Sequence, residues 1–238
     1  IRELKKFRID KKRLVELSTL LREPIAIDYF DAKRNPREIL TEVLIGSIKT
    51  IPALVGEIFT EEERSISGIY EGILRAVASG KEVSGEISSY LFSRKLIKKD
   101  DPSIIQQYLN NLVNFGIIKK IKVYNKKRFV YKHVSPLIRI FYYADEKYNI
   151  SEREPTESEI KEIIDELLPK IIEDTIREFL ARKFGLQESI IKDKDYDIDV
   201  CLLKFKKQEI AAEIKWKKEI KKRDIIKAER NLIRVDAK

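Results

Sequence analysis

The 238-residue chain is poor in the residue types that most metal and nucleophile chemistry uses. It holds one Cys, one His, one Trp and no Met. A lone Cys201 cannot form an intrachain disulfide or a cysteine zinc site, which favours a reducing cytoplasm. A Ser–His or Cys–His triad would depend on His133 alone, and its place at the end of a predicted strand favours a structural or surface position.

Long apolar runs are also missing. No stretch reaches the ~18 consecutive apolar residues of a membrane-spanning helix, so no transmembrane helix is expected. No basic-then-apolar leader opens the sequence, which favours a cytoplasmic protein over a secreted one. The chain starts at Ile1 and lacks Met, although average usage gives about five in this length, which predicts a fragment of a longer protein.

Charge is plentiful in both signs. Lys and Arg number 49 against 40 Asp and Glu, giving a net charge of +9, and 43% of residues are hydrophobic. This composition excludes a disordered chain and favours a nucleic-acid partner. The richness in Lys, Glu and Ile is typical of proteins from hyperthermophiles. The length predicts one large domain or two small ones.

The pattern of apolar residues divides the chain into three segments. Residues 1–65 are predicted to form helices broken at Pro24, Pro36 and Pro52, with Asn35-Pro36 starting one of them. The second segment is 66–150 and the third 151–238, with the polar run 149–158 as the linker. Together they predict an α/β fold with a large helical share.

The middle segment carries the clearest pattern. An amphipathic helix closed by Gly80 is followed by a short helix over 84–92. A third helix is expected to begin with Asp101 as its N-cap and Pro102 in its first turn, and to end at Gly116. Two strands, 117–123 and 128–134, follow. Three helices and a β-hairpin are the order of a winged helix-turn-helix domain.

This order predicts DNA contact through the third helix and the hairpin. Amide side chains, which can bond to adenine edges, occupy the exposed face of the helix: Gln106, Gln107, Asn110, Asn111 and Asn114. The hairpin is basic and suits phosphate contact, through Lys119, Lys120, Lys122, Lys126, Lys127, Arg128 and Lys132. The alternatives are a solvated basic hairpin or a protein partner.

The last segment is predicted to contain a helix, two strands and a helix. The first strand covers 197–205, the turn 206–208, and the return strand 209–216. Alternation along the return strand places Glu213 and Lys215 on one face. Antiparallel pairing then brings the start of the first strand opposite this pair.

Asp199, Glu213 and Lys215 are therefore expected to share one patch. Two carboxylates suit a hard cation such as Mg²⁺, and a lysine can orient or help to deprotonate a water and stabilise charge at phosphorus. If the register slips by two residues, Asp195 or Asp197 replaces Asp199. The alternative is an ordinary amphipathic hairpin whose polar face happens to carry these groups.

An Asp followed by Glu-x-Lys on an apolar strand resembles the PD-(D/E)XK nuclease family, which includes restriction endonucleases and Holliday-junction resolvases. The resemblance implies a restriction-endonuclease-like α/β domain in which Asp199 and Glu213 hold metal and Lys215 is catalytic. It also implies an assisting acidic residue on the preceding helix, where Glu173 stands. The chain departs from the family in having no Pro before the Asp.

A wider resemblance, over about residues 45–216, is to the C-terminal half of the archaeal ATPase family. It rests on the nuclease-like residues named above and on five further segments: 51–53 (IPA), 73–80 (ILRAVASG), 108–112 (YLNNL), 116–118 (GII) and 135–143 (SPLIRIFYY). The resemblance implies that residues 1–65 are the helical lid of an ATPase core upstream in the full-length protein. This chain has no P-loop, because Gly80-Lys81 lacks the earlier Gly and the following Ser or Thr.

The sequence thus predicts a DNA-binding protein with a Mg²⁺-dependent phosphodiesterase site. Two other functions remain open. One is the regulatory, DNA-binding half of an ATPase whose nuclease-like domain does not cut. The other is a protein–protein adaptor whose basic hairpin meets an acidic partner.

Overall fold

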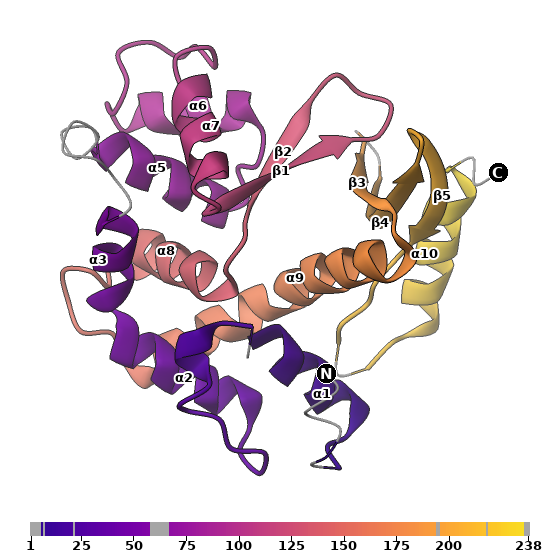
Figure 1. Cartoon of the computed structure of the whole chain (residues 1–238), viewed down its shortest axis with the longest axis horizontal. Coiled ribbons are helices and arrows are strands. Elements are labelled where there is room, and N and C mark those ends of the chain that lie inside the picture. The colour runs from indigo at the N-terminus through magenta and orange to yellow at the C-terminus, as the bar shows by residue number, and fades with distance from the viewer. Residues whose placement is uncertain are drawn as a thin grey trace. The chain divides into compact units, whose positions relative to one another are not determined.

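The chain folds into an α/β protein, about 55% helical, whose helical N-terminal half precedes a five-stranded mixed sheet (Figure 1). The computed structural model describes residues 6, 8–20, 22–57, 67–193, 196–217 and 219–235. The helices are α1 (Lys11–Leu20), η2 (Pro24–Ala26), α2 (Pro36–Ser47), α3 (Thr50–Glu57), α5 (Ser67–Ala78), α6 (Ser84–Ser93), α7 (Gln106–Asn114), α8 (Pro136–Tyr148), α9 (Glu157–Phe184) and α10 (Lys222–Ile233). The strands are β1 (Ile118–Val123), β2 (Phe129–His133), β3 (Gln187–Lys192), β4 (Asp197–Lys204) and β5 (Lys207–Ala212).

Backbone contacts group the chain into two units. The first contains residues 1–120 and 131–167, and the second contains 121–130 and 168–238. The tip of the β1–β2 hairpin thus belongs with the C-terminal strands. The boundaries expected from sequence, after residues 65 and 150, stay predictions.

The N-terminal helices begin largely where proline places them. Pro36 is the first residue of α2, and the Asn35 side chain caps the helix by accepting the Arg37 N–H at 3.0 Å. The break expected at Pro52 falls just before it, between the end of α2 at Ser47 and the start of α3 at Thr50; Pro52 lies in the first turn of α3, where a missing N–H costs nothing. No single described helix is long and apolar enough to cross a membrane; α2 and α3, bent by 65°, pass that test only as a pair.

The middle helices confirm the predicted glycine ends. Gly80 (φ +85°) and Gly116 (φ +73°) adopt the left-handed conformation that closes α5 and α7. The predicted start of α7 is too early, because the four residues after Asp101 form turns and the helix begins at Gln106. The Asp101 carboxylate caps that turn by accepting the Ser103 N–H at 2.9 Å.

His133 is buried in the first unit, at 8% exposure, where its Nε2 lies 3.0 Å from the Leu74 carbonyl oxygen. Burial lowers the pKa of this imidazole to about 3. Of the two places expected from its sequence position, structural or surface, His133 takes the buried one.

The sheet has the order β2-β1-β3-β4-β5. β1 pairs in parallel with β3, and β3, β4 and β5 pair antiparallel to one another. No strand was predicted where β3 lies. The predicted β4–β5 turn is also one residue late, since the turn is Phe205-Lys206, with φ of +49° and +68°.

Each face of the C-terminal strands packs against a different helix. On one face, Val200 and Leu202 pack with Ala181 of α9. On the other, Cys201 and Leu203 pack with Leu232, of α10. Successive residues of a strand alternate between faces, so β4 is buried on both. This double burial fixes the register that positions the polar groups at the end of β5.

Candidate functional site

The candidate site lies where β5 ends and the chain continues toward α10. The predicted return strand over 209–216 contained Glu213 and Lys215, but β5 stops at Ala212. The two residues therefore follow the strand and do not lie in it. Alternation nevertheless continues, because Ile214 packs on the α9 face together with Ala212. Glu213 and Lys215 therefore belong to the α10 face.

The three groups singled out from the sequence lie together. Lys215 Nζ is 3.5 Å from Asp199 Oδ2 and forms a hydrogen bond to Glu213 Oε2. The Ile214 N–H donates to Asp199 Oδ2 at 2.8 Å, which ties the end of β5 to β4. On the other side, Asn231 of α10 donates through Nδ2 to Glu213 Oε1 at 3.0 Å. Both carboxylates are thus held by fixed donors.

These groups line a cavity of about 530 Å³. Its wall is formed by Asp193, Tyr196, Asp197, Asp199, Glu213, Lys215, Lys217, Asp224, Lys227 and Asn231. Five of these side chains are carboxylates and three are lysines. The balance of formal charge is negative, which favours a cation in the cavity.

Burial governs the electrostatics of the cluster. It raises the pKa of Asp199, and the Ile214 N–H and Lys215 offset this only in part. Burial opposes the charge on Lys215 too, but the hydrogen bond to Glu213 and the nearby Asp199 outweigh it, so the pKa of Lys215 is raised. At neutral pH Lys215 is therefore a cation.

A buried arginine fixes the backbone of the site from the α9 side. The side chain of Arg177 is 3% exposed, and its Nη1 donates to the Asp199 carbonyl oxygen at 3.0 Å. The same guanidinium contacts Asp174 at 2.5 Å and Glu188 at 3.4 Å. Arg177 thus holds β4 in place behind the carboxylate of Asp199.

Of the other acidic residues predicted from the sequence, only Asp197 is described at the cavity. Glu173 lies on α9, the helix that packs on the opposite sheet face from α10, and it does not line the cavity. Asp197 lines the same cavity as Asp199. Asp195 falls outside the described residues.

The amides predicted to face DNA on α7 differ in their surroundings. Gln107 and Asn110 are exposed. Gln106 is half-buried and donates to the Pro102 carbonyl at 3.1 Å, while Asn111 donates to the Tyr70 hydroxyl at 2.8 Å. Two of the five amides are therefore already engaged within the protein.

The basic hairpin is part of the sheet. Lys126 Nζ donates to the Lys192 carbonyl at 2.8 Å and pairs with Asp193 at 3.1 Å. Arg128 donates to the same Lys192 carbonyl at 2.9 Å. The other predicted contacts comprise the half-buried Lys119 and Lys132 and the exposed Lys120, Lys122 and Lys127. Lys126 and Arg128 thus fasten the hairpin to β3.

Protein families, curated proteins and solved structures were compared with this chain, and none of them matches. The geometry of the site is therefore the basis for assigning its chemistry.

Two carboxylates of the cavity, Asp199 and Glu213, are the residues that could hold a magnesium ion. The described residues contain no group of three acidic, His or Cys side chains placed to hold a metal. Mg²⁺, however, is commonly bound by one or two carboxylates together with waters and substrate phosphates. Asp199 and Glu213 supply that number of oxygen ligands from two rigidly joined segments.

Sequence reasoning missed three residues that shape this region: Arg177, Asn231 and Gln208. Arg177 and Asn231 lie on helices whose sequence pattern does not show which strand they face. Gln208 is turned by an irregularity in β5, where Leu202 pairs with Ile210 but Leu203 pairs with Gln208. No local sequence signal marks such a bulge.

Proposed function

We propose that this protein is a DNA-binding phosphodiesterase that uses Mg²⁺ at Asp199 and Glu213, in a domain of the PD-(D/E)XK nuclease type. The observation that carries the proposal is the convergence of these carboxylates with Lys215 in one cavity. Partly buried charged groups such as these are costly unless they are paired or bind a ligand.

Each residue has a distinct part in this proposal. Asp199 and Glu213 hold the cation, which when bound neutralises charge on a scissile phosphate. Lys215, a cation at neutral pH, binds and orients a phosphate oxygen and stabilises negative charge that develops at phosphorus. Asn231 keeps Glu213 in place through its hydrogen bond. Arg177 positions Asp199 through the backbone.

DNA binding is proposed for the middle segment, as a winged helix. Support comes from the order of α5, α6, α7 and the hairpin, and from the exposed lysines of that hairpin. The bonds from Lys126 and Arg128 to β3 restrict those two side chains to a structural part, so phosphate contact is assigned to their exposed neighbours.

The chain is proposed to be the C-terminal portion of an archaeal-type ATPase.

The proposal is tested by incubating the protein with single-stranded, duplex and branched DNA in Mg²⁺ or Mn²⁺. Glu213→Gln and Lys215→Met are each expected to lower the cleavage rate by about 100-fold or more. Glu229→Gln, at an exposed position of α10 outside the cavity, is the matched control and should cleave normally.

Two results would contradict the enzymatic proposal. One is the absence of cleavage of every DNA form with either metal. The other is cleavage that Glu213→Gln leaves unchanged. Equal melting temperatures of the variants and the control show that any loss of rate is not a loss of fold.

A second candidate is a DNA-binding domain with a nuclease fold that does not cut. It is favoured by one observation, that Lys215 already bridges both carboxylates. In that case the triad is a structural ion-pair network. DNA binding without cleavage, together with a melting temperature that falls in Lys215→Met, would favour this candidate.

A further inference from the structure

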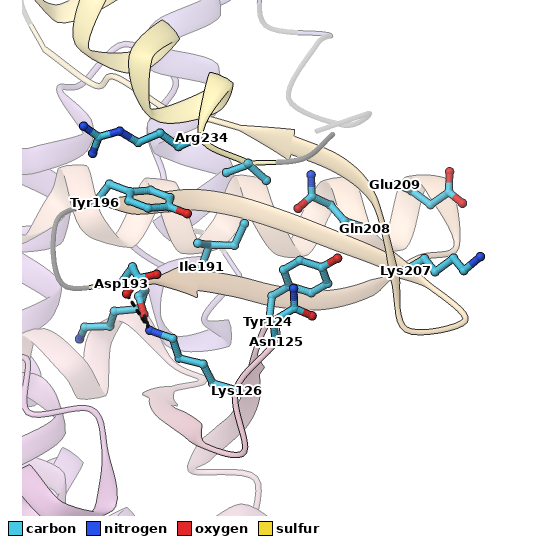
Figure 2. Close-up of a pocket in the computed structure, with 12 residues that line it drawn as sticks. Tyr124, Asn125, Lys126, Ile191, Asp193, Tyr196, Lys207, Gln208, Glu209 and Arg234 are labelled. Carbon is cyan, nitrogen blue, oxygen red and sulfur yellow. Dashed lines mark hydrogen bonds and ion pairs between the residues drawn. The ribbon is translucent and has the colours of Figure 1, made fainter. Parts of the chain in front are cut away.

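A second cavity, of about 610 Å³, lies beside the candidate site and shares Asp193 and Tyr196 with it. Figure 2 shows Ile191 between the rings of Tyr196 and Tyr124, with Gln208 near Tyr124. The cavity is formed by the hairpin tip, β3, Asp193 and Tyr196 between β3 and β4, β5, and the residues that follow α10. Nothing in the chemistry proposed above uses it.

Gln208 is the unusual residue of this cavity. It is 7% exposed, and neither its Nε2 nor its Oε1 has a hydrogen-bond partner among the described residues. Regular alternation would place it with Ile210 against α9. The bulge at Glu209 instead pairs it with Leu203 and turns it to the cavity face. A buried amide without a partner in the protein has a donor and an acceptor that a ligand can satisfy.

The walls of the cavity are aromatic and apolar. Tyr124 and Tyr196 pack against a cluster that includes Ile191 and Val235. The Arg234 guanidinium lies 5.6 Å from the centre of the Tyr196 ring. Tyrosine rings and an arginine plane are the surfaces on which unstacked bases are held in single-stranded nucleic acids.

The charge of this cavity is opposite to that of the candidate site. Its cationic side chains are Lys126, Lys192, Lys207 and Arg234, against two carboxylates, Asp193 and Glu209. A net positive lining favours an anionic ligand, and phosphate groups supply that charge in nucleic acids.

We propose that this cavity binds one unpaired base of a DNA strand, with the amide of Gln208 bonded to the edge of the base and the ring against Tyr124 or Tyr196. A primary amide presents one donor and one acceptor side by side, which matches the edge of a base such as adenine. Because the two cavities share Asp193 and Tyr196, the neighbouring phosphodiester extends toward Asp199 and Glu213. The inference rests on the proposed function and narrows its substrate to DNA with unpaired nucleotides.

The test compares two fluorescein-labelled 20-mers of equal phosphate number, oligodeoxyadenylate and a fully abasic strand, bound to the whole chain in EDTA. Fluorescence anisotropy is expected to show at least about tenfold tighter binding of the strand that carries bases. Gln208→Leu should remove most of this preference and leave the affinity for the abasic strand unchanged. Gln187→Leu, at an exposed position of β3, is the matched control and should keep the preference.

Three results would overturn the inference. They are equal affinity of the wild-type protein for both strands, an unchanged preference in Gln208→Leu, and a fall in affinity for both strands alike. The melting temperature of Gln208→Leu should equal or exceed that of the wild type, because an unpartnered buried amide is replaced by an apolar side chain. A marked fall would show a partner within the protein and contradict the site.

The assay in EDTA separates this inference from the proposed function. A base preference that depends on Gln208, without cleavage in Mg²⁺, leaves the base site standing and rejects the phosphodiesterase. Cleavage that depends on Glu213, without any base preference, supports the phosphodiesterase and rejects the base site.

Discussion

Replacing Arg177 by Met tests the internal support of the site. The guanidinium is 3% exposed and interacts with Asp174, Glu188 and the Asp199 carbonyl. Burial disfavours its charge, but the two carboxylates outweigh this and raise the pKa of Arg177. Removing one partner of a buried, hydrogen-bonded ion network costs about 3–5 kcal/mol, because the remaining, mostly buried carboxylates lose their compensating charge.

Urea unfolding measures this loss. Trp216, the one tryptophan of the chain, lies in the second unit and reports on its unfolding through fluorescence. Arg182→Met is the matched control: its guanidinium is 79% exposed and pairs with Glu178 at 2.8 Å across one helical turn. An exposed pair of this kind contributes about 0.5 kcal/mol or less.

The expected result is a large loss of unfolding free energy for Arg177→Met and a small one for Arg182→Met. A loss below about 1 kcal/mol for Arg177→Met would refute the reasoning, since a buried network cannot be removed so cheaply. Cleavage should fall in parallel under conditions where the variant is still folded, because β4 then loses the contact behind Asp199.

Three further predictions follow from burial and charge. In the metal-free protein the carboxyl of Asp199 should titrate above its ordinary pKa, because burial outweighs the Ile214 N–H and Lys215; an NMR titration that places it at or below the ordinary pKa contradicts this. The pKa of His133 is lowered to about 3 in the folded protein, so on acidification this imidazole is protonated in the unfolded chain before it is protonated in the folded one. Lowering the pH from 7.5 to 5 should therefore cost the wild type about 2 kcal/mol of unfolding free energy. His133→Gln should not show this loss. Replacing the exposed Lys120 and Lys127 by Gln should lower the slope of log affinity for duplex DNA against log salt by about two, and an unchanged slope would exclude phosphate contact by the hairpin.

Features set by neighbouring residues could be predicted from the sequence. The glycine ends of α5 and α7 and the cap of α2 depend on a few adjacent residues whose preferences are strong. The approach of Asp199 to Glu213 and Lys215 follows from a hairpin register that the buried faces of both strands fix. These are local or two-segment relations.

Features that depend on distant segments could not be predicted. β3 opens on polar residues, and besides its neighbour β4 it pairs with β1, far back in the chain, where Lys122 aligns with Ser189. Pairing between segments so far apart leaves no local periodicity. The bulge that turns Gln208 into the second cavity is likewise set by how β5 meets β4, and the residues around it carry no turn signal.

Calorimetric titration with Mn²⁺ tests the central claim most directly, because it asks whether Asp199 and Glu213 hold a divalent cation. The wild-type protein and Glu229→Gln should bind the ion with the same stoichiometry, and Asp199→Asn and Glu213→Gln should each lose a site. Binding that is identical in all four proteins, or absent from the folded wild type with and without DNA, would contradict a metal-dependent phosphodiesterase at this cavity.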